Sequence, residues 1–140
     1  MNNHEIAILI PAYNPSESLI NLTNLLIEEK YIIVVVNDGS NEESNKIFKK
    51  LNKDIIIINH LKNMGKGTAL KTGFNYIKDN IECIGVITAD ADGQHLFEDI
   101  KNVSEYLAKN DGSIILGSRT NMKSAPFRSK FRKLLDQKNI

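Results

Sequence analysis

The chain has 140 residues, the size of a single domain, and 41% of them are hydrophobic, which is enough for a packed core. Its formal net charge of +1 gives no overall field that would attract nucleic acid or an anionic membrane, so we expect no nucleic-acid partner. The composition therefore excludes a disordered chain and indicates one globular domain.

Targeting signals and disulfides are also excluded by simple patterns. The single cysteine, Cys83, rules out an internal disulfide and is typical of a reducing compartment. The N-terminus lacks a signal-peptide pattern, and the longest apolar stretch, residues 31–36, is too short to cross a bilayer. We expect a cytoplasmic chain without a transmembrane segment. His4, His60 and Cys83 are predicted to have surface or packing roles only.

The first half of the chain alternates strand and helix patterns. Residues 6–10 form a β-branched apolar run that predicts a buried strand, and Pro11 ends it. Ser16 is the predicted N-cap of a helix whose leucines recur at helical spacing. Residues 31–36 predict the second strand, and Asn41 is the predicted cap of a short helix after the turn that follows.

The second half continues this alternation. Residues 55–58 predict the third strand, and a glycine-rich loop at 65–67 leads into a helix. Residues 84–89 predict the fourth strand. The remaining predicted elements are a helix at 98–109, a fifth strand at 113–117 and a helix at 127–135.

The architecture follows from strands that are apolar on both faces. Such strands predict an α/β fold in which a mostly parallel sheet has helices on both faces, and in such sheets ligands bind at the carboxyl ends of the strands. A polar segment follows each predicted strand, so we expect these segments to converge on one edge. They are residues 11–14, 37–40, 63–67, 90–95 and 117–119.

The acidic segment after the fourth strand suggests a metal site. Asp90 and Asp92 point to the same side in extended backbone, Gln94 adds an amide oxygen, and His95 is a further candidate ligand. Oxygen ligands of this kind suit Mg²⁺ or Mn²⁺. A plain surface turn is the alternative interpretation. A calcium EF-hand is a poor match because Gly93 comes too early in the loop.

Other side chains at this edge suit a nucleotide. Tyr13 can stack on a base or pack in the core, and Asp38 can accept hydrogen bonds from a nucleoside or simply shape a turn. Lys66 stands at a helix N-terminus, which favours an anion. Arg119 suits a phosphate, while Arg128 and its basic neighbours either extend that anion site or form a solvated helix face.

Taken together, five segments occur in the order seen in family 2 glycosyltransferases. They are residues 10–14, 36–40, 63–67, 90–94 and 117–119. From about residue 6 to 128 the chain resembles the branch that contains dolichyl-phosphate mannose synthases and other polyprenyl-phosphate glycosyltransferases. The resemblance implies a GT-A fold, a UDP- or GDP-sugar donor and inverting transfer to a polyprenyl phosphate or a glycan hydroxyl, as in cell-envelope glycan synthesis.

The resemblance also assigns roles to residues. The nucleotide-sugar residues would be Pro11, Ala12, Tyr13, Asn14, Asp38, Ser40, Lys66, Asp90 and Ala91. Mg²⁺ or Mn²⁺ would be held by Asp90, Asp92 and Gln94. The catalytic residues would be Asp92 and Arg119, and Arg119 and Arg128 would meet an acceptor phosphate. A peripheral position at the inner face of the membrane, an oligomer or a membrane-associated partner would fit the same branch.

The chain departs from the family pattern at its end and at three internal positions. It stops at Ile140, so we expect a single GT-A-like domain over residues 1–140 that lacks the C-terminal acceptor part and has little or no transfer activity alone. Asn37 stands where many members carry an aspartate, and Leu96 and Phe97 replace frequent prolines.

Three alternatives stay open. A catalytically incomplete module that binds a nucleotide sugar or a partner protein is favoured by the early stop. A sugar-phosphate nucleotidyltransferase would want a glycine-rich, arginine-containing loop after the first strand, which residues 11–15 are not. A haloacid-dehalogenase-type phosphatase carries its two aspartates after the first strand, whereas Asp90 and Asp92 follow the fourth.

Overall fold

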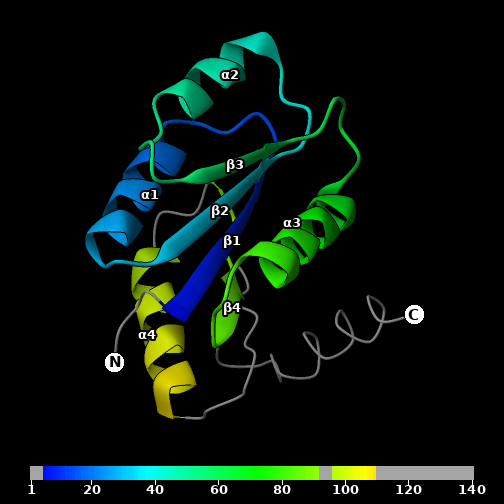
Figure 1. The fold of residues 1–140 in the computed structure, drawn as a ribbon. Helices are drawn as coiled ribbons and strands as arrows, with labels where there is room; N and C mark the ends of the chain where they lie inside the picture. Colours follow the sequence, from blue (N-terminus) through cyan, green and yellow to red (C-terminus); the bar gives the residue numbers. More distant parts are fainter. Residues whose placement is uncertain (1–4, 92–95, 110–140) are drawn as a thin grey trace.

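The computed structural model describes residues 5–91 and 96–109. These residues form one parallel sheet with the strand order β3-β2-β1-β4 (Figure 1). Its strands are β1 (Ile6–Ala12), β2 (Ile32–Asn37), β3 (Ile56–Asn59) and β4 (Gly85–Thr88). The predicted α/β class with a parallel sheet is confirmed.

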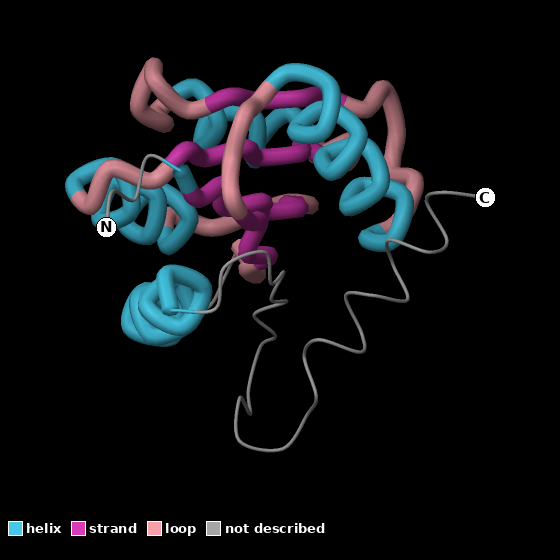
Figure 2. Tube along the Cα trace, turned by 60° about the horizontal axis from the view of Figure 1, so that its bottom comes forward, coloured by secondary structure: helices cyan, strands magenta, loops and turns pink. Residues whose placement is uncertain are grey.

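Helices cover both faces of the sheet. They are α1 (Ser18–Glu28), α2 (Glu42–Lys49), α3 (Lys66–Asn80) and α4 (Leu96–Lys109). The chain moves from β1 outward to β2 and β3 through α1 and α2, and α3 then carries it back past β1 to β4. Because parallel crossovers are right-handed, this reversal puts α3 on the opposite face from α1 and α2 (Figures 1 and 2).

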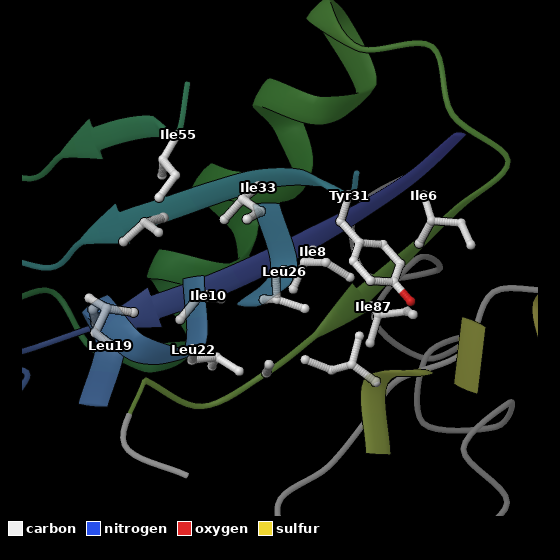
Figure 3. Close-up of a cluster of buried hydrophobic side chains, with 14 of the residues drawn as sticks. Ile6, Ile8, Ile10, Leu19, Leu22, Leu26, Tyr31, Ile33, Ile55 and Ile87 are labelled. Atoms are coloured by element: carbon white, nitrogen blue, oxygen red, sulfur yellow. The ribbon is translucent and has the colours of Figure 1, made fainter. Parts of the chain in front are cut away.

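The core divides into two clusters because neighbouring strand residues point to opposite faces. Ile6, Ile8 and Ile10 of β1 are fully buried on the side of α1 and α4 (Figure 3). Ala7 and Leu9 of the same strand are fully buried on the side of α3. β1 is thus buried from both faces, which explains why its sequence shows no polar alternation.

The predicted helix caps are confirmed in one case and shifted in the other. The side-chain oxygen of Asn41 accepts a hydrogen bond from the backbone N–H of Ser44 at 2.8 Å, as expected for an N-cap. α1 begins at Ser18, with Glu17 rather than Ser16 at the capping position. The Ser16 hydroxyl still accepts from the Ser18 N–H at 3.4 Å, so it remains close to the helix start.

The predicted glycine-rich loop at 65–67 is partly wrong. α3 already begins at Lys66, and only Gly65, with φ of 97°, keeps a non-helical backbone. Gly67 therefore lies in the first turn of the helix rather than in a loop. The fifth strand at 113–117 and the last helix at 127–135 lie outside the described residues.

Candidate functional site

A cavity of about 520 Å³ opens at the carboxyl edge of the sheet. β1 and β4 are neighbours there, but the chain leaves β1 toward β2 and returns to β4 from the other side. This is the topological switch point where open α/β sheets bind ligands. The lining residues are Pro11, Ala12, Tyr13, Asn14, Pro15, Ser16, Asp38, Asn63, Lys66, Ala69, Asp90 and Ala91.

This cavity brings together all but one of the predicted nucleotide-sugar residues. Ser40 lies in the neighbouring hollow beside α2 and β3, and it reaches the cavity loop through a hydrogen bond from the Asn14 backbone N–H. Tyr13 is 55% exposed and lines the cavity, so core packing is not its role. The other predicted residues, Asp92, Gln94, His95, Arg119 and Arg128, lie outside the described residues, and their roles stay predictions.

Asn14 fastens the loop after β1 to the loop after β2. Its backbone N–H donates to the Ser40 hydroxyl at 2.9 Å, and its side-chain oxygen accepts from the Asn41 N–H at 2.9 Å. Its φ of 49° lies in the left-handed region, which asparagine tolerates better than most residues. These two bonds hold the backbone next to Tyr13 at the mouth of the cavity.

Asp38 fastens the loop after β2 to the start of α3. The side chain is almost completely buried, yet its carboxylate accepts hydrogen bonds from the N–H groups of Met64 and Gly65, both at 2.9 Å. The Nδ1 of His60 lies 2.8 Å from the same carboxylate. Burial alone would raise the pKa of Asp38, but these three hydrogen bonds outweigh it and leave the pKa below its usual value.

His60 is the site residue that the sequence analysis missed. Its Nε2 lies 2.8 Å from the Thr72 hydroxyl of α3, so the ring bridges Asp38 and that helix. The feature that could have identified His60 is the register of two strands. β2 and β3 are parallel, with Asn37 opposite Asn59, and this register places residues 38 and 60 side by side. The assignment of Cys83 to packing agrees with its half-buried thiol, whose pKa is raised by burial.

Gly39 lets these loops approach closely. Its φ is 69°, and a Cβ added there would overlap the backbone of Lys62 and Asn63. Only glycine accommodates both conditions. We call the segments 13–16, 38–41 and 60–65 the hydrogen-bonded wall of the cavity, since the bonds above join them into one unit.

Lys66 and Asp90 form the second part of the site, which we call the charged rim. The Nζ of Lys66 lies 2.7 Å from an Asp90 carboxylate oxygen, and the two side chains are 51% and 22% exposed. The pair joins the start of α3 to the end of β4 across the cavity. The cavity thus offers an aromatic surface at Tyr13 and opposite charges at the rim, which suits a ligand with a planar part and an anionic part.

Asp90 belongs to the predicted set of metal ligands and lies at the charged rim. Within residues 5–91 and 96–109, no group of three or more His, Cys, Asp or Glu side chains comes together. Asp90 alone of the predicted ligands is described, and its carboxylate already accepts a cationic group, the ammonium of Lys66. Its chemistry and position therefore fit one ligand of a hard cation. Over the same residues, no helix is both long and apolar enough to span a membrane.

Comparison with known proteins decides the family. The family described as Glycosyl transferase family 2 matches residues 7–138. The chain belongs to glycosyltransferase family 2. Its parallel sheet with helices on both faces is accordingly a GT-A fold.

Relatives of this family 2 chain act on polyprenyl phosphates by name. The UDP-N-acetylglucosamine–dolichyl-phosphate N-acetylglucosaminyltransferase of Methanococcus voltae is 33% identical over 130 residues, covering 81% of this chain and 51% of the relative. The undecaprenyl-phosphate 4-deoxy-4-formamido-L-arabinose transferase of Edwardsiella ictaluri is 30% identical over 142 residues, covering 94% and 42%. The predicted resemblance to the polyprenyl-phosphate branch is confirmed. The chain spans about half the length of these relatives.

Proposed function

We propose that this chain binds a nucleotide-diphosphate sugar in its cavity and forms the donor-binding part of a metal-dependent, inverting glycosyltransferase that acts on a polyprenyl phosphate. The observation that carries the proposal is the cavity at the switch point, which gathers Tyr13, Asp38 and Asp90 from three loops and Lys66 from the start of α3. The names of the relatives supply the substrate class, since one names a UDP-sugar with dolichyl phosphate and another an undecaprenyl phosphate.

The nucleoside would lie against the end of β1 and the loop that follows it. Pro11 and Ala12 offer an apolar surface there, and the exposed Tyr13 offers a ring on which a base or ribose can pack. Asp38 supports this loop system from behind, because its carboxylate already accepts three hydrogen bonds. A carboxylate has about four acceptor positions, so one further hydrogen bond from the nucleoside is compatible with this arrangement.

The diphosphate would lie at the charged rim. Lys66 supplies a positive charge, and the first-turn N–H groups of α3 lack intrahelical acceptors and favour an anion. The cavity that Lys66 and Asp90 line has a volume of about 520 Å³, which leaves room for it. Asp90, with Asp92 and Gln94, would hold Mg²⁺ or Mn²⁺. When bound, that cation offsets negative charge on the departing nucleoside diphosphate.

The acceptor would approach the sugar from the face opposite the diphosphate, which inverts the anomeric carbon. A polyprenyl phosphate is already anionic and needs no general base, whereas a glycan hydroxyl would need one. Arg119 and Arg128 are the residues that we propose for the acceptor phosphate, because a guanidinium matches phosphate geometry. A lipid acceptor would bring the protein to the inner face of the membrane as a peripheral protein.

A thermal-shift screen of UDP- and GDP-sugars, with and without Mn²⁺, tests the donor site. A bound donor at a hundred times its Kd adds about 2.7 kcal/mol of stability, so we expect a rise of about 5 °C or more with one donor class. Asp90→Asn and Asp92→Asn should each remove the Mn²⁺-dependent part of the rise. A melting temperature that no nucleotide sugar changes would contradict the donor site.

Transfer is tested separately, by incubating the chain with the bound donor and a short polyprenyl phosphate. Formation of a lipid-phosphate sugar would support the complete proposal. Donor binding without any transfer would instead identify a nucleotide-sugar-binding module. A sugar-phosphate nucleotidyltransferase would show a different product, pyrophosphate released from a nucleoside triphosphate.

A further inference from the structure

The start of α3 is held by contacts that lie behind the cavity. The carboxylate of Asp38 accepts from the backbone N–H groups of Met64 and Gly65, and its backbone oxygen accepts from the side-chain Nδ2 of Asn63 at 3.4 Å. Lys66 follows directly and reaches Asp90 at 2.7 Å. The position of Lys66 at the rim therefore depends on how firmly Asp38 holds the turn before it.

His60 is placed to control how Asp38 holds the turn before Lys66. Its side chain is 9% exposed, it does not belong to the described lining of the cavity, and its two ring nitrogens contact Asp38 and Thr72 at 2.8 Å each. Toward the carboxylate, Nδ1 must carry a proton and donate. Nε2 then accepts from the Thr72 hydroxyl if the ring is neutral, or donates to it if the ring is charged.

We propose that His60 is a positioning residue of the donor site. By donating to Asp38, it fixes the carboxylate in the orientation that receives the Met64 and Gly65 amides, and so keeps Lys66 opposite Asp90. A buried carboxylate that loses a donor turns toward other partners, because an unsatisfied buried charge is costly. This inference rests on the proposed donor site for its functional consequence. The contacts of His60 with Asp38 and Thr72, which we call the clamp, are independent of any ligand.

Two amide substitutions separate the two ends of the ring. The side-chain nitrogen of asparagine can replace Nδ1, and that of glutamine reaches the position of Nε2. His60→Asn should therefore keep the hydrogen bond to Asp38 and lose the one to Thr72, while His60→Gln should do the reverse. Tyr31→Phe is the matched control, since it removes a buried 2.7 Å hydrogen bond to Ser104 at the opposite edge of the sheet.

The first readout is the rate of hydrogen exchange at the backbone amides of Met64 and Gly65, which NMR measures on the protein without ligand. We expect exchange at both amides to be about tenfold faster in His60→Gln, as for the loss of a hydrogen bond to a charged group, and close to wild type in His60→Asn and Tyr31→Phe. If His60→Gln does not fold, Thr72→Val replaces it, since it keeps the ring and removes only the hydroxyl that holds Nε2; exchange at both amides should then be faster by a smaller factor. Equal protection of these amides in all variants would overturn the clamp.

The second readout is affinity for the UDP- or GDP-sugar, with Mn²⁺, that gives the largest thermal shift. We expect His60→Gln to weaken binding about tenfold and His60→Asn to restore most of it. In a Lys66→Ala background, the effect of His60→Gln on affinity should vanish, because His60 acts through the position of Lys66. A purely structural role would lower the melting temperature and weaken binding equally in both backgrounds.

The two proposals fail in different ways. If the wild-type chain binds no nucleotide sugar, the proposed function is wrong, and the exchange experiment still decides the clamp. If donors bind and His60→Gln changes neither the amides nor the affinity, the donor site stands and the positioning role of His60 is overturned.

Discussion

The two parts of the cavity are built in different ways. The hydrogen-bonded wall is fixed by short contacts around a buried carboxylate, Asp38, and by the reciprocal bonds between Asn14 and residues 40–41. The charged rim is made by an ion pair whose lysine is half exposed, Lys66 with Asp90. Buried hydrogen bonds to a charge are strong, whereas exposed ion pairs contribute little to stability.

This difference suggests a division of labour. The wall is already shaped before a ligand arrives, so a nucleoside bound there would order few groups and would lose little affinity to ordering. At the rim, Lys66 and Asp90 can separate at small cost, Lys66 toward a diphosphate and Asp90 toward a cation. Variants of the wall should therefore change both stability and binding, and variants of the rim should change binding alone.

The largest effect is expected for Asp38→Asn, which breaks the wall at its centre. One acceptor oxygen becomes an NH₂ group that faces donors, so we expect the free energy of unfolding to fall by about 2 kcal/mol. Nucleotide-sugar binding should weaken as well. Urea denaturation measures the first effect and a thermal-shift titration the second. Asp54→Asn makes the same change on an exposed carboxylate and should alter neither.

Acid should weaken the wall in a defined direction. The pKa of Asp38 is lower in the folded chain than its usual value of 3.8, so its ionised form stabilises the fold above that value. This contribution is lost as the pH falls from about 4 through the lowered pKa. The difference in unfolding free energy between the wild type and Asp38→Asn should shrink between pH 5 and pH 3. A constant difference would mean that Asp38 is not the titrating group.

At the rim, we expect Lys66→Met to weaken nucleotide-sugar binding about tenfold, as for the loss of one charge-assisted contact. The free energy of unfolding should change by less than about 0.5 kcal/mol, because the lysine of this ion pair is half exposed. Lys71→Met, an exposed lysine on the same helix, is the control and should change neither quantity. A large loss of stability in Lys66→Met would erase the contrast between wall and rim.

The smallest difference is expected between two substitutions of Asn14. Asn14→Gly keeps the left-handed backbone and loses only the bond from the Asn41 N–H, which costs about 1 kcal/mol. Asn14→Ala loses the same bond and adds backbone strain of about 1 kcal/mol. Chemical denaturation of the two variants should therefore rank alanine below glycine. The reverse order would show that the positive φ at Asn14 is not maintained in solution.

Much of the fold could be predicted because its strands are simple. The apolar runs around Ile8 and Val34 have no polar alternation, which is what burial from both faces requires. From a parallel sheet it follows that Tyr13, Asp38 and Asp90 meet at one edge, although they are far apart in the chain. Convergence of the loops was therefore predictable without knowing the order of the strands.

The finer contacts were not predictable in the same way. His60 gains its role only from the register of β2 and β3, which no local pattern reveals. α3 begins at Lys66, earlier than predicted. Asp38, in the loop after β2, accepts a hydrogen bond from the N–H of Gly65 just before that start. Ser40 was expected to line the cavity, but it lies in the neighbouring hollow and accepts a hydrogen bond from the backbone N–H of Asn14, which does line the cavity. In each case a tertiary hydrogen bond decides what the local sequence leaves open.

The most direct test of the central claim is an NMR titration of the ¹⁵N-labelled chain with a UDP- or GDP-sugar and Mg²⁺. We expect the amide shifts to concentrate at residues 12–14 and 63–67 and at Asp90, and to be absent from the opposite edge of the sheet around Ile32 and Gly85. Shifts confined to other surfaces, or no shifts with either donor class, would contradict a nucleotide-sugar site in this cavity.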